Sequence, residues 1–322
     1  MKACVIGSKA RAPSTMKIYE AMKESGRFSS VLFVPTEGIR IGVKKNKFPI
    51  FYREIDLSSF DAVVPRIGAS KAMFGHLITK YLIEAGVYVP MSPDSILIAH
   101  DKYLTLEALN RAKVPIPETY LTMSPPCAKR VVSELKPPIV MKLLGGTGGK
   151  GVMFSNDEEN AFSLIDTLNV LRQPLFIEKY VKNPGEDIRI IVIGKHAVAS
   201  MKRNAKKGSK RSNLASGGKG VSHKIDTTLE SIAVKSAKAI GAEICGVDVI
   251  EGPKGPLVVE MNISPGMKIA DITNKNIPRM IADYVADRAE TYRPKEGIKK
   301  VSYYIEKELA KIPKWFLEAL EE

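Results

Sequence analysis

The sequence predicts an α/β fold in which a parallel N-terminal sheet is followed by two α+β units. Strand-like and helix-like segments alternate over the first third of the chain, as they do in proteins with parallel sheets. Further on, a glycine-rich run at 145–151 lies between two short β-forming segments. A second hairpin, apolar and interrupted by single acids, spans 244–262. These three features separate a parallel part from two later parts built on hairpins.

The first unit is expected to span residues 1–94 and to end near a Met-Ser-Pro-Asp segment at 91–94. The turn after its first strand, Gly7-Ser8-Lys9, lacks the full dinucleotide fingerprint, so NAD binding is not expected there. The elements predicted in this unit are strand 3–7, helix 14–24, strand 30–34, strand 62–65, helix 73–85 and strand 87–89.

Two α+β units and a helical extension follow, with predicted bounds 95–184, 185–292 and 293–322. The extension reads as an amphipathic helix that packs on the body or on a second subunit. The elements predicted in the middle unit are helix 101–111, helix 127–135, strand 139–143, strand 151–154, helix 157–168 and strand 175–178. Those predicted in the third are strands 187–193 and 197–201, helix 228–240 and the hairpin 244–262.

The bulk composition is that of a soluble globular chain of 322 residues, 44% hydrophobic and 26% charged. No apolar run approaches the ~20 residues of a membrane span. The apolar stretch near the N-terminus is too short for a signal peptide. The three cysteines form no C-x-x-C pair and the four histidines lack ligand spacing. We therefore expect a cytoplasmic protein without zinc and without a membrane partner.

The net charge of +14 suggests an anionic partner. Much of it is local: residues 202–224 hold eight lysines or arginines and no acid. This segment is also rich in glycine, so it resembles a second cationic loop, although a solvated loop is the ordinary interpretation. It has no interleaved aromatic residues on which bases could stack, which argues against a nucleic-acid partner.

The glycine run belongs to the stretch KLLGGTGGKGVMF at 142–154. A P-loop is excluded, since Lys150 is followed by Gly151 and not by serine or threonine. The G-x-G-x-x-G pattern fits at Gly146, Gly148 and Gly151, but β-formers follow where a dinucleotide fold needs a helix. Strand, glycine loop and strand remain, which indicates either a hairpin that folds over a nucleotide or a mobile surface hairpin.

The hairpin at 244–262 carries Asp248, Glu260 and Asn262 within apolar strands. Glu260 and Asn262 share a face because side chains alternate along a strand. A plain two-residue turn would place Asp248 opposite residue 259, so a bulged or odd-numbered turn is needed to bring it to that face. Hard oxygen ligands of this kind suit Mg²⁺ shared with phosphates. The alternative is salt bridging to Arg189 or Arg203.

The remaining parts of a nucleotide site can be placed around these two hairpins. Lys142 immediately precedes the glycine run, and Lys102 begins a helix from which it could reach phosphates. An apolar strand end at 176–181 suits adenine, and either Glu186 or Asp187 could hold the ribose.

Taken in order, these segments resemble the ATP-grasp superfamily and, within it, the RimK-type alpha-L-glutamate ligase family. The resemblance covers about residues 60–290. The segments that carry it are VVPRIG (63–68), HDK (100–102), VMKLLGGTGGKGV (140–152), IEKYV (177–181), DIR (187–189), KRNA (202–205), RSNL (211–214) with GG (217–218), GVDV (246–249) and VEMNISPG (259–266). The chain departs from the family at Lys179, where an apolar or aromatic residue is common, and in the tail beyond Arg293.

The resemblance implies a pre-ATP-grasp domain followed by two ATP-grasp subdomains that bind ATP between them. A carboxylate is phosphorylated and an amine then forms the amide. The implied nucleotide ligands are Lys102, Lys142, Gly146, Thr147, Gly148, Gly149, Glu178, Lys179, Tyr180, Val181, Asp187, Arg211 and Asn213. Mg²⁺ or Mn²⁺ would lie on Asp248, Glu260 and Asn262. The implied catalytic residues are Arg203, Arg211 and Asn213, and the substrate would meet Arg66, Arg203, Ser264 and Gly266.

The resemblance also implies the substrate class. We expect L-glutamate to be added to an acidic acceptor, either a glutamate-ended peptide or protein or a glutamylated cofactor. Another amino acid or an amino-group carrier protein is the alternative within the superfamily, and an anion- or nucleic-acid-binding protein on this scaffold is the alternative outside it. A protein kinase is excluded because neither H-R-D nor D-F-G occurs. A homo-oligomer, dimer or tetramer, is the expected assembly.

Overall fold

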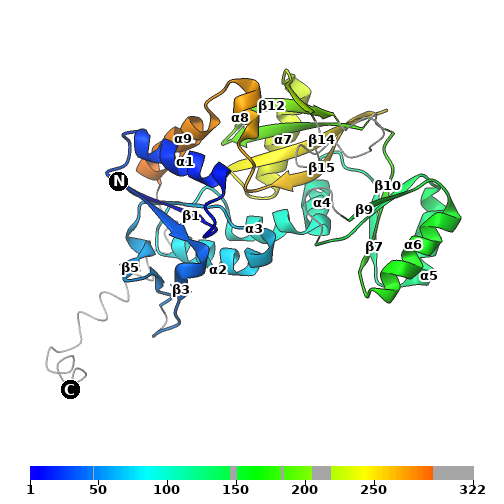
Figure 1. Cartoon of the computed structure of the whole chain (residues 1–322), viewed down its shortest axis with the longest axis horizontal. Helices are drawn as coiled ribbons and strands as arrows, with labels where there is room; N and C mark the ends of the chain where they lie inside the picture. The colour runs from blue at the N-terminus through cyan, green and yellow to red at the C-terminus, as the bar shows by residue number, and fades with distance from the viewer. Residues whose placement is uncertain (46, 146–150, 183–184, 205–218, 293–322) are drawn as a thin grey trace.

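The computed structural model describes residues 1–45, 47–145, 151–182, 185–204 and 219–292. Within them the strands form a three-stranded, a four-stranded and a five-stranded sheet and a small three-stranded one. Figure 1 shows the N-terminal sheet at one end of the molecule and the four-stranded sheet at the other, with the five-stranded sheet between and above them. In the described residues no helix is long and apolar enough to cross a membrane.

The N-terminal sheet has the order β2-β1-β6 and is parallel, which confirms the predicted α/β class. Segment 87–89 is no strand: it makes a single bridge, Ala62 to Tyr88, before Pro90. The small sheet was missed because its strands are only two or three residues long. The elements are β1 (Lys2–Gly7), α1 (Pro13–Glu24), β2 (Ser30–Pro35), β3 (Ile39–Ile41), β4 (Ile50–Tyr52), β5 (Ile55–Asp56), β6 (Ala62–Pro65) and α2 (Ala72–Glu84), with 3-10 turns at Thr36–Gly38, Leu57–Ser59 and Ala69–Lys71.

The four-stranded central sheet has the order β7-β10-β8-β9. One of its faces packs on α5 and α6 through buried residues that include Ile139, Met141 and Ile177. Alternation turns Lys142, Phe176 and Glu178 to the other face. The elements here are α3 (Pro93–His100), α4 (Lys102–Arg111), β7 (Thr119–Thr122), α5 (Pro125–Leu135), β8 (Ile139–Lys142), β9 (Val152–Ser155), α6 (Glu158–Val170) and β10 (Leu175–Lys179). Of these, α3 and β7 were not predicted.

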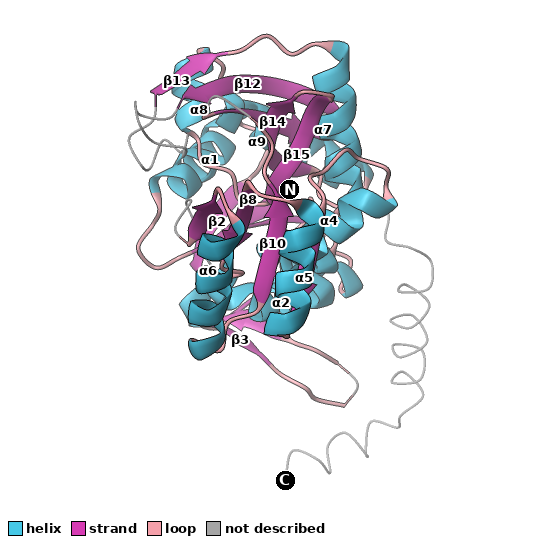
Figure 2. Ribbon diagram, turned by 90° about the vertical axis from the view of Figure 1, so that its right-hand side faces the viewer, coloured by secondary structure: helices cyan, strands magenta, loops and turns pink. Residues whose placement is uncertain are grey.

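The five-stranded sheet is antiparallel, with the order β13-β12-β11-β14-β15. Its apolar face packs on α7, and Figure 2 shows this layer above the central sheet. On the opposite face, Ile191 and Ile193 pack with α8 and α9. The elements are β11 (Glu186–Ile193), β12 (His196–Asn204), β13 (Lys219–Ser222), α7 (Thr227–Ala239), β14 (Ile244–Gly252), β15 (Gly255–Asn262), α8 (Lys268–Thr273) and α9 (Ile277–Thr291).

A bulge sets the register of the β14–β15 hairpin. Gly252 pairs with Gly255 around a two-residue loop, and Val249 still pairs with Val258. The next pair is Asp248 with Glu260, so Val259 is the extra residue. The predicted odd-numbered or bulged turn is wrong, because the turn has two residues, but a bulge within the strands brings Asp248 and Glu260 to one face as expected.

Candidate active site

The central sheet places a lysine and a glutamate side by side on the face turned away from α5 and α6. Lys142 Nζ donates to Glu178 at 2.8 Å. Phe176, directly opposite Lys142 in the ladder, lies in the hydrophobic core that also contains residues of β11, β14 and β15. The lysine and glutamate side chains are 15% and 6% exposed, so the pair lies at the junction of the two sheets.

The five-stranded sheet contributes a cluster of ion pairs at its polar end. Arg189 donates from Nε and Nη2 to the two oxygens of Asp248, at 2.6 and 2.5 Å. Arg203 Nη2 lies 2.9 Å from Asp248 Oδ2, and its Nε donates to Asp187. Alternation explains the grouping: Asp187 and Arg189 continue the face on which Ile191 is covered by α8 and α9. That face is apolar under the helices and charged beyond them.

The Asp248 carboxyl, 3% exposed, has a pKa of about 2. Burial alone would raise this pKa, but the charges of Arg189 and Arg203 and their hydrogen bonds outweigh burial. Burial would likewise lower the pKa of Arg203, whereas Asp248 and Asp187 raise it. Asp248 and Arg203 are therefore both charged at neutral pH.

Glu260 behaves differently from Asp248, its neighbour in the ladder. Its side chain is exposed to solvent, although its carboxyl group lies near the charges of Asp248, Arg189, Lys102 and Lys142. Burial and the charge of Asp248 raise the pKa of Glu260, while Arg189, Lys102 and Lys142 oppose that rise. Asn262 Nδ2 lies 3.4 Å from Asp248 Oδ2. The three oxygen-bearing side chains predicted to bind metal thus share one face.

Lys102 comes to the same place from α4. Its Nζ donates to the carbonyl of Leu144 at 2.9 Å. Burial and the charge of Lys142 lower the pKa of Lys102, and the charge of Glu260 raises it. A small pocket of about 70 Å³ adjoins these groups. It is lined by Ala69, Ala99, His100, Lys102, Thr105, Leu144, Gly145, Val259 and Glu260.

The segment predicted to hold adenine connects the two sheets. The carboxylate of Glu178 faces Lys142, and Lys179 is exposed. Tyr180 packs edge-to-face on Phe154, with ring centroids 6.1 Å apart. Val181 lies against the tip of the β14–β15 hairpin at Gly252. The beginning of this linker thus contacts both β9 and the β14–β15 hairpin.

The predicted substrate residues lie where the N-terminal sheet meets the loop after β15. Arg66 follows β6, and its Nη2 donates to the carbonyl of Pro265 at 2.8 Å. Ser264 immediately precedes that proline, and Gly266 follows it on the exposed side. Arg66 thus contacts the loop that carries Ser264, from a chain segment far away in sequence.

Some predicted site residues lie outside the described residues, and their roles stay predictions. They are Gly146, Thr147, Gly148, Gly149, Arg211 and Asn213. The extension at 293–322 also lies outside them.

The oxygen ligands of Asp248, Glu260 and Asn262 fit Mg²⁺ in chemistry, since hard cations prefer carboxylate and amide oxygens. The pairs predicted as the alternative, from Arg189 and Arg203 to Asp248, are formed in the structure. In the residues the structure describes, no three His, Cys, Asp or Glu side chains are grouped as a metal site. Metal binding at this face remains a prediction, and it requires Asp248 to give up part of its arginine contacts.

Two contributors were missed from the sequence. His100 was not among the predicted site residues, yet it lines the pocket, and its Nε2 lies 2.9 Å from the carbonyl of Ile67. Its position next to Asp101 and Lys102 was the available signal. Val259 was not predicted as a site residue either, but it is the extra residue of the bulge and it lines the pocket.

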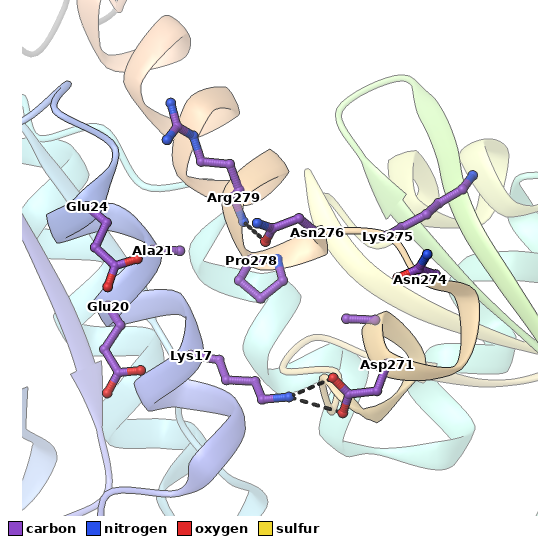
Figure 3. A pocket seen from close by; sticks show the side chains of 11 residues that line it. Lys17, Glu20, Ala21, Glu24, Asp271, Asn274, Lys275, Asn276, Pro278 and Arg279 are labelled. Atoms are coloured by element: carbon purple, nitrogen blue, oxygen red, sulfur yellow. Dashed lines mark hydrogen bonds and ion pairs between the residues drawn. The ribbon is translucent and has the colours of Figure 1, made fainter.

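A larger hollow lies elsewhere, between α1 and the α8–α9 segment. Its volume is about 510 Å³. Figure 3 shows Lys17 of α1 paired with Asp271 of α8, with Glu20 and Glu24 on the same helix as Lys17. The Nζ of Lys17 lies 2.9 Å from Oδ1 of Asp271. Acidic and basic side chains both line this hollow, but none of the ion pairs of the candidate active site lies in it. The volume of a cavity therefore does not identify the candidate active site in this molecule.

Two family models match the chain. The RimK PreATP-grasp domain matches residues 1–96 and the RimK-like ATP-grasp domain matches residues 99–285. Among curated proteins, a "Probable alpha-L-glutamate ligase" of Thioalkalivibrio sulfidiphilus is 34% identical over 298 residues, which is 91% of this chain and 98% of the relative. A protein of the same name from Ectopseudomonas mendocina is 35% identical over 293 residues, 90% of this chain and 97% of the relative.

Solved structures share the fold at low identity. The ATP-grasp ligase PsnB, complexed with a minimal precursor, Mg and ADP, has a TM-score of 0.71 at 17% identity. That likeness covers 89% of this chain and 97% of PsnB. A RimK domain ATP-grasp protein from Sphaerobacter thermophilus has a TM-score of 0.65 at 19% identity, covering 88% of this chain and 99% of the other.

Proposed function

Because this chain belongs to the RimK-like ATP-grasp family and is an ATP-grasp ligase, we propose that it joins L-glutamate to an acidic acceptor through an acyl phosphate. The acceptor is a peptide or protein that ends in glutamate, or a cofactor that carries a glutamyl tail. The bond formed is an amide, and ATP is converted to ADP and phosphate.

One observation carries this proposal: two lysines, one from the central sheet and one from α4, lie close to the oxygen-bearing side chains of the five-stranded sheet. Lys142 belongs to β8, Lys102 to α4 and Glu260 to β15. The charges of both lysines lower the pKa of Glu260, and the charge of Glu260 raises that of Lys102. Such a meeting of cations and hard oxygens suits a nucleotide polyphosphate with its metal.

In the first step, a carboxylate oxygen of the acceptor attacks the γ-phosphorus of ATP. The bond from that phosphorus to the bridging oxygen breaks, and ADP leaves. Lys102 and Lys142 are positioned to bind the phosphates and to neutralise charge that spreads in the transition state. Glu178 holds the Lys142 ammonium at 2.8 Å until a phosphate competes for it.

Asp248, Glu260 and Asn262 would hold Mg²⁺, with Mn²⁺ as the second candidate. The ion would supply positive charge next to the transferred phosphoryl group. The neighbouring Arg189 and Arg203 keep Asp248 ionised, which is the form in which a carboxylate binds metal.

In the second step, the uncharged amine of L-glutamate attacks the acyl carbon. A C–N bond forms, the C–O bond to phosphate breaks, inorganic phosphate leaves, and the amine loses a proton. Arg203, 3% exposed at the buried end of the cluster, is positioned to stabilise negative charge on the departing phosphate.

The acidic acceptor is supported by three facts. The curated relatives are named alpha-L-glutamate ligases. Fold neighbours such as PsnB and MdnC were crystallised with precursor peptides. The net charge of +14 favours association with anionic partners.

The test is ADP release by the full chain with Mg-ATP, L-glutamate and a glutamate-ended peptide, with mass spectrometry of the peptide. We expect release that depends on L-glutamate and a peptide heavier by one or more glutamyl residues. D-Glutamate and L-glutamine serve as matched controls, and Lys142→Ala should remove both ADP release and ATP binding. Release that is equally fast with L-glutamine, or a peptide of unchanged mass, would refute glutamate ligation.

A further inference from the structure

Arg66 is a buried cation with few hydrogen-bond partners among the described residues. It is 9% exposed, and its Nη2 donates to the carbonyl of Pro265. Its Nε has no hydrogen-bond partner among the residues that the structure describes. Among the same residues no carboxylate forms a salt bridge with it, whereas Arg189 and Arg203 both have one.

Such burial is costly, because a charge removed from water is normally paired or fully hydrogen-bonded. Burial lowers the pKa of Arg66 to about 10. An arginine held in this way is destabilising unless an anion joins it.

A second donor nearby also lacks a partner. The Oγ of Ser264 is buried without a hydrogen bond among the described residues, and Ser264 immediately precedes the proline that Arg66 contacts. A Cβ built on Gly266 would meet only Ser14 Oγ, at 3.8 Å, so there is open space on this side of the loop. Ser14 lies in the first turn of α1, whose N-terminus carries partial positive charge. All of these features favour an anion.

The place is close to the reacting groups but separate from the phosphate lysines. Ser264 is two residues beyond Asn262 in the chain. The carbonyl of Ile67, next to Arg66, lies 2.9 Å from His100 Nε2, and His100 lines the same pocket as Lys102 and Glu260. Arg66 also follows β6, at the carboxyl edge of a parallel sheet, where ligands of open α/β folds bind.

We propose that Arg66, with the hydroxyl of Ser264, binds a substrate carboxylate that does not react. A guanidinium matches a carboxylate in shape and offers it paired N–H donors. The inference rests on the proposed function and deepens it: the site selects a substrate that has a second carboxylate, as glutamate has. That carboxylate can belong to the incoming amino acid or to the last glutamate of the acceptor, and kinetics separates the two.

The test compares full-length Arg66→Met and Arg66→Lys with wild type. Arg27→Met is the matched control: it makes the same change of charge at an arginine that pairs with Asp287 and Glu290 on the surface. KM is measured separately for ATP, L-glutamate and the glutamate-ended peptide. We expect Arg66→Met to raise KM for one dicarboxylate substrate by about tenfold to a hundredfold, with KM for ATP unchanged. Arg66→Lys should recover part of the loss, and Arg27→Met should match wild type.

A rise in KM confined to L-glutamate assigns the site to the incoming amino acid. A rise in KM confined to the peptide assigns it to the acceptor. Both support the proposal. Values of both KM within about twofold of wild type would overturn it.

Thermal unfolding separates binding from a structural role. Since the buried charge is unpaired, Arg66→Met should unfold no lower than wild type in the absence of substrates. A clear fall in its melting temperature would mean that Arg66 is structural and would overturn the proposal.

Protection by sodium glutarate, against sodium chloride at equal ionic strength, tests the site without turnover. Glutarate should raise the melting temperature of wild type and Arg27→Met but not of Arg66→Met. This holds even if wild type proves inactive with glutamate, so failure of the proposed function and failure of the carboxylate site give different results. Equal protection of wild type and Arg66→Met would overturn the site.

Discussion

Asp248 and Glu260 face each other across the β14–β15 ladder, yet their environments shift their pKa values in opposite directions. Asp248 receives two arginines and is held ionised. Glu260 has no such contact among the described ion pairs, and burial together with the charge of Asp248 disfavours its ionised form. One carboxylate therefore stabilises the folded chain while the other is kept at a cost to stability, which is typical of a functional group.

Asp248→Asn is expected to destabilise the protein by about 3 kcal/mol, because two arginines lose a buried charged partner. Urea unfolding at neutral pH, without nucleotide, measures the free energy. The pKa of Asp248 is lowered to about 2, so its contribution to stability is present at neutral pH. That contribution is lost as pH falls from about 4 to about 2. The variant should lack this acid-dependent loss; an unchanged unfolding free energy at neutral pH would contradict the ion-pair account.

Glu260→Gln, unlike Asp248→Asn, is expected not to destabilise the folded protein. The raised pKa means that ionised Glu260 costs stability at neutral pH, and that this cost is relieved as pH falls. The melting temperature without metal should equal or exceed that of wild type. ADP release should nevertheless fall by about a hundredfold or more, because the variant loses the charge of a proposed metal ligand. A lower melting temperature together with retained ADP release would show that Glu260 is structural.

At the scale of elements, the linker after β10 is held against the tip of the β14–β15 hairpin. A Cβ on Gly252 would lie 3.0 Å from Val181 Cγ1 and 3.3 Å from the carbonyl oxygen of Gly255. The absence of a side chain at Gly252 therefore lets the hairpin approach the segment predicted to hold adenine. In the proposed nucleotide site, the acids of the hairpin would lie at one end of the nucleotide and its tip at the other.

Gly252→Val should displace Val181 and raise KM for ATP by about fivefold to tenfold, as overpacking of about 1 kcal/mol would. KM for L-glutamate should stay the same. Initial rates at varied ATP measure this, with Lys254→Ala in the exposed turn as the control. If both variants keep the wild-type KM for ATP, the linker does not position the nucleotide.

At the scale of the whole molecule, Glu243 joins three distant segments. Tyr88 and Tyr284 each donate to Glu243 Oε2 at 2.6 Å, and Arg288 Nε lies 3.4 Å from it. Tyr88 follows the N-terminal sheet, Glu243 immediately precedes β14, and the other two residues belong to α9. This cluster fastens the N-terminal sheet to the five-stranded sheet, so that Arg66 can reach the loop after β15.

Tyr88→Phe should lower the free energy of unfolding by about 1–2 kcal/mol, since a buried hydrogen bond to a carboxylate is lost. For a chain of this size the melting temperature should fall by about 2–4 °C. Differential scanning calorimetry measures the change, and Tyr103→Phe, at a more exposed tyrosine on α4, is the control. ADP release well below the transition should stay at the wild-type rate; a large loss of activity would place Tyr88 closer to the chemistry than the structure does.

Much of the fold and part of the site could be predicted because they are encoded in local patterns. Alternation of strands and helices predicts the parallel sheet, and single acids within apolar strands predict the bulge that brings Asp248 opposite Glu260. The short strands β3 to β5 could not be predicted, because two or three residues carry too little periodicity. The segment at 87–89 was overpredicted because its apolar residues are buried by packing and not by a ladder.

By itself, the sequence determined the class of the fold, the hairpin with its oxygen ligands and the family to which the chain belongs, since each follows from residues close together in the chain. The tertiary structure decided which charges meet. Arg189 and Asp248 are 59 residues apart, and Arg66 and Pro265 are 199 apart. Periodicity assigns a side chain to a face of its own element, whereas its partner depends on how distant elements pack, and only that packing leaves Asp248 doubly paired and Arg66 buried without a carboxylate among the described residues.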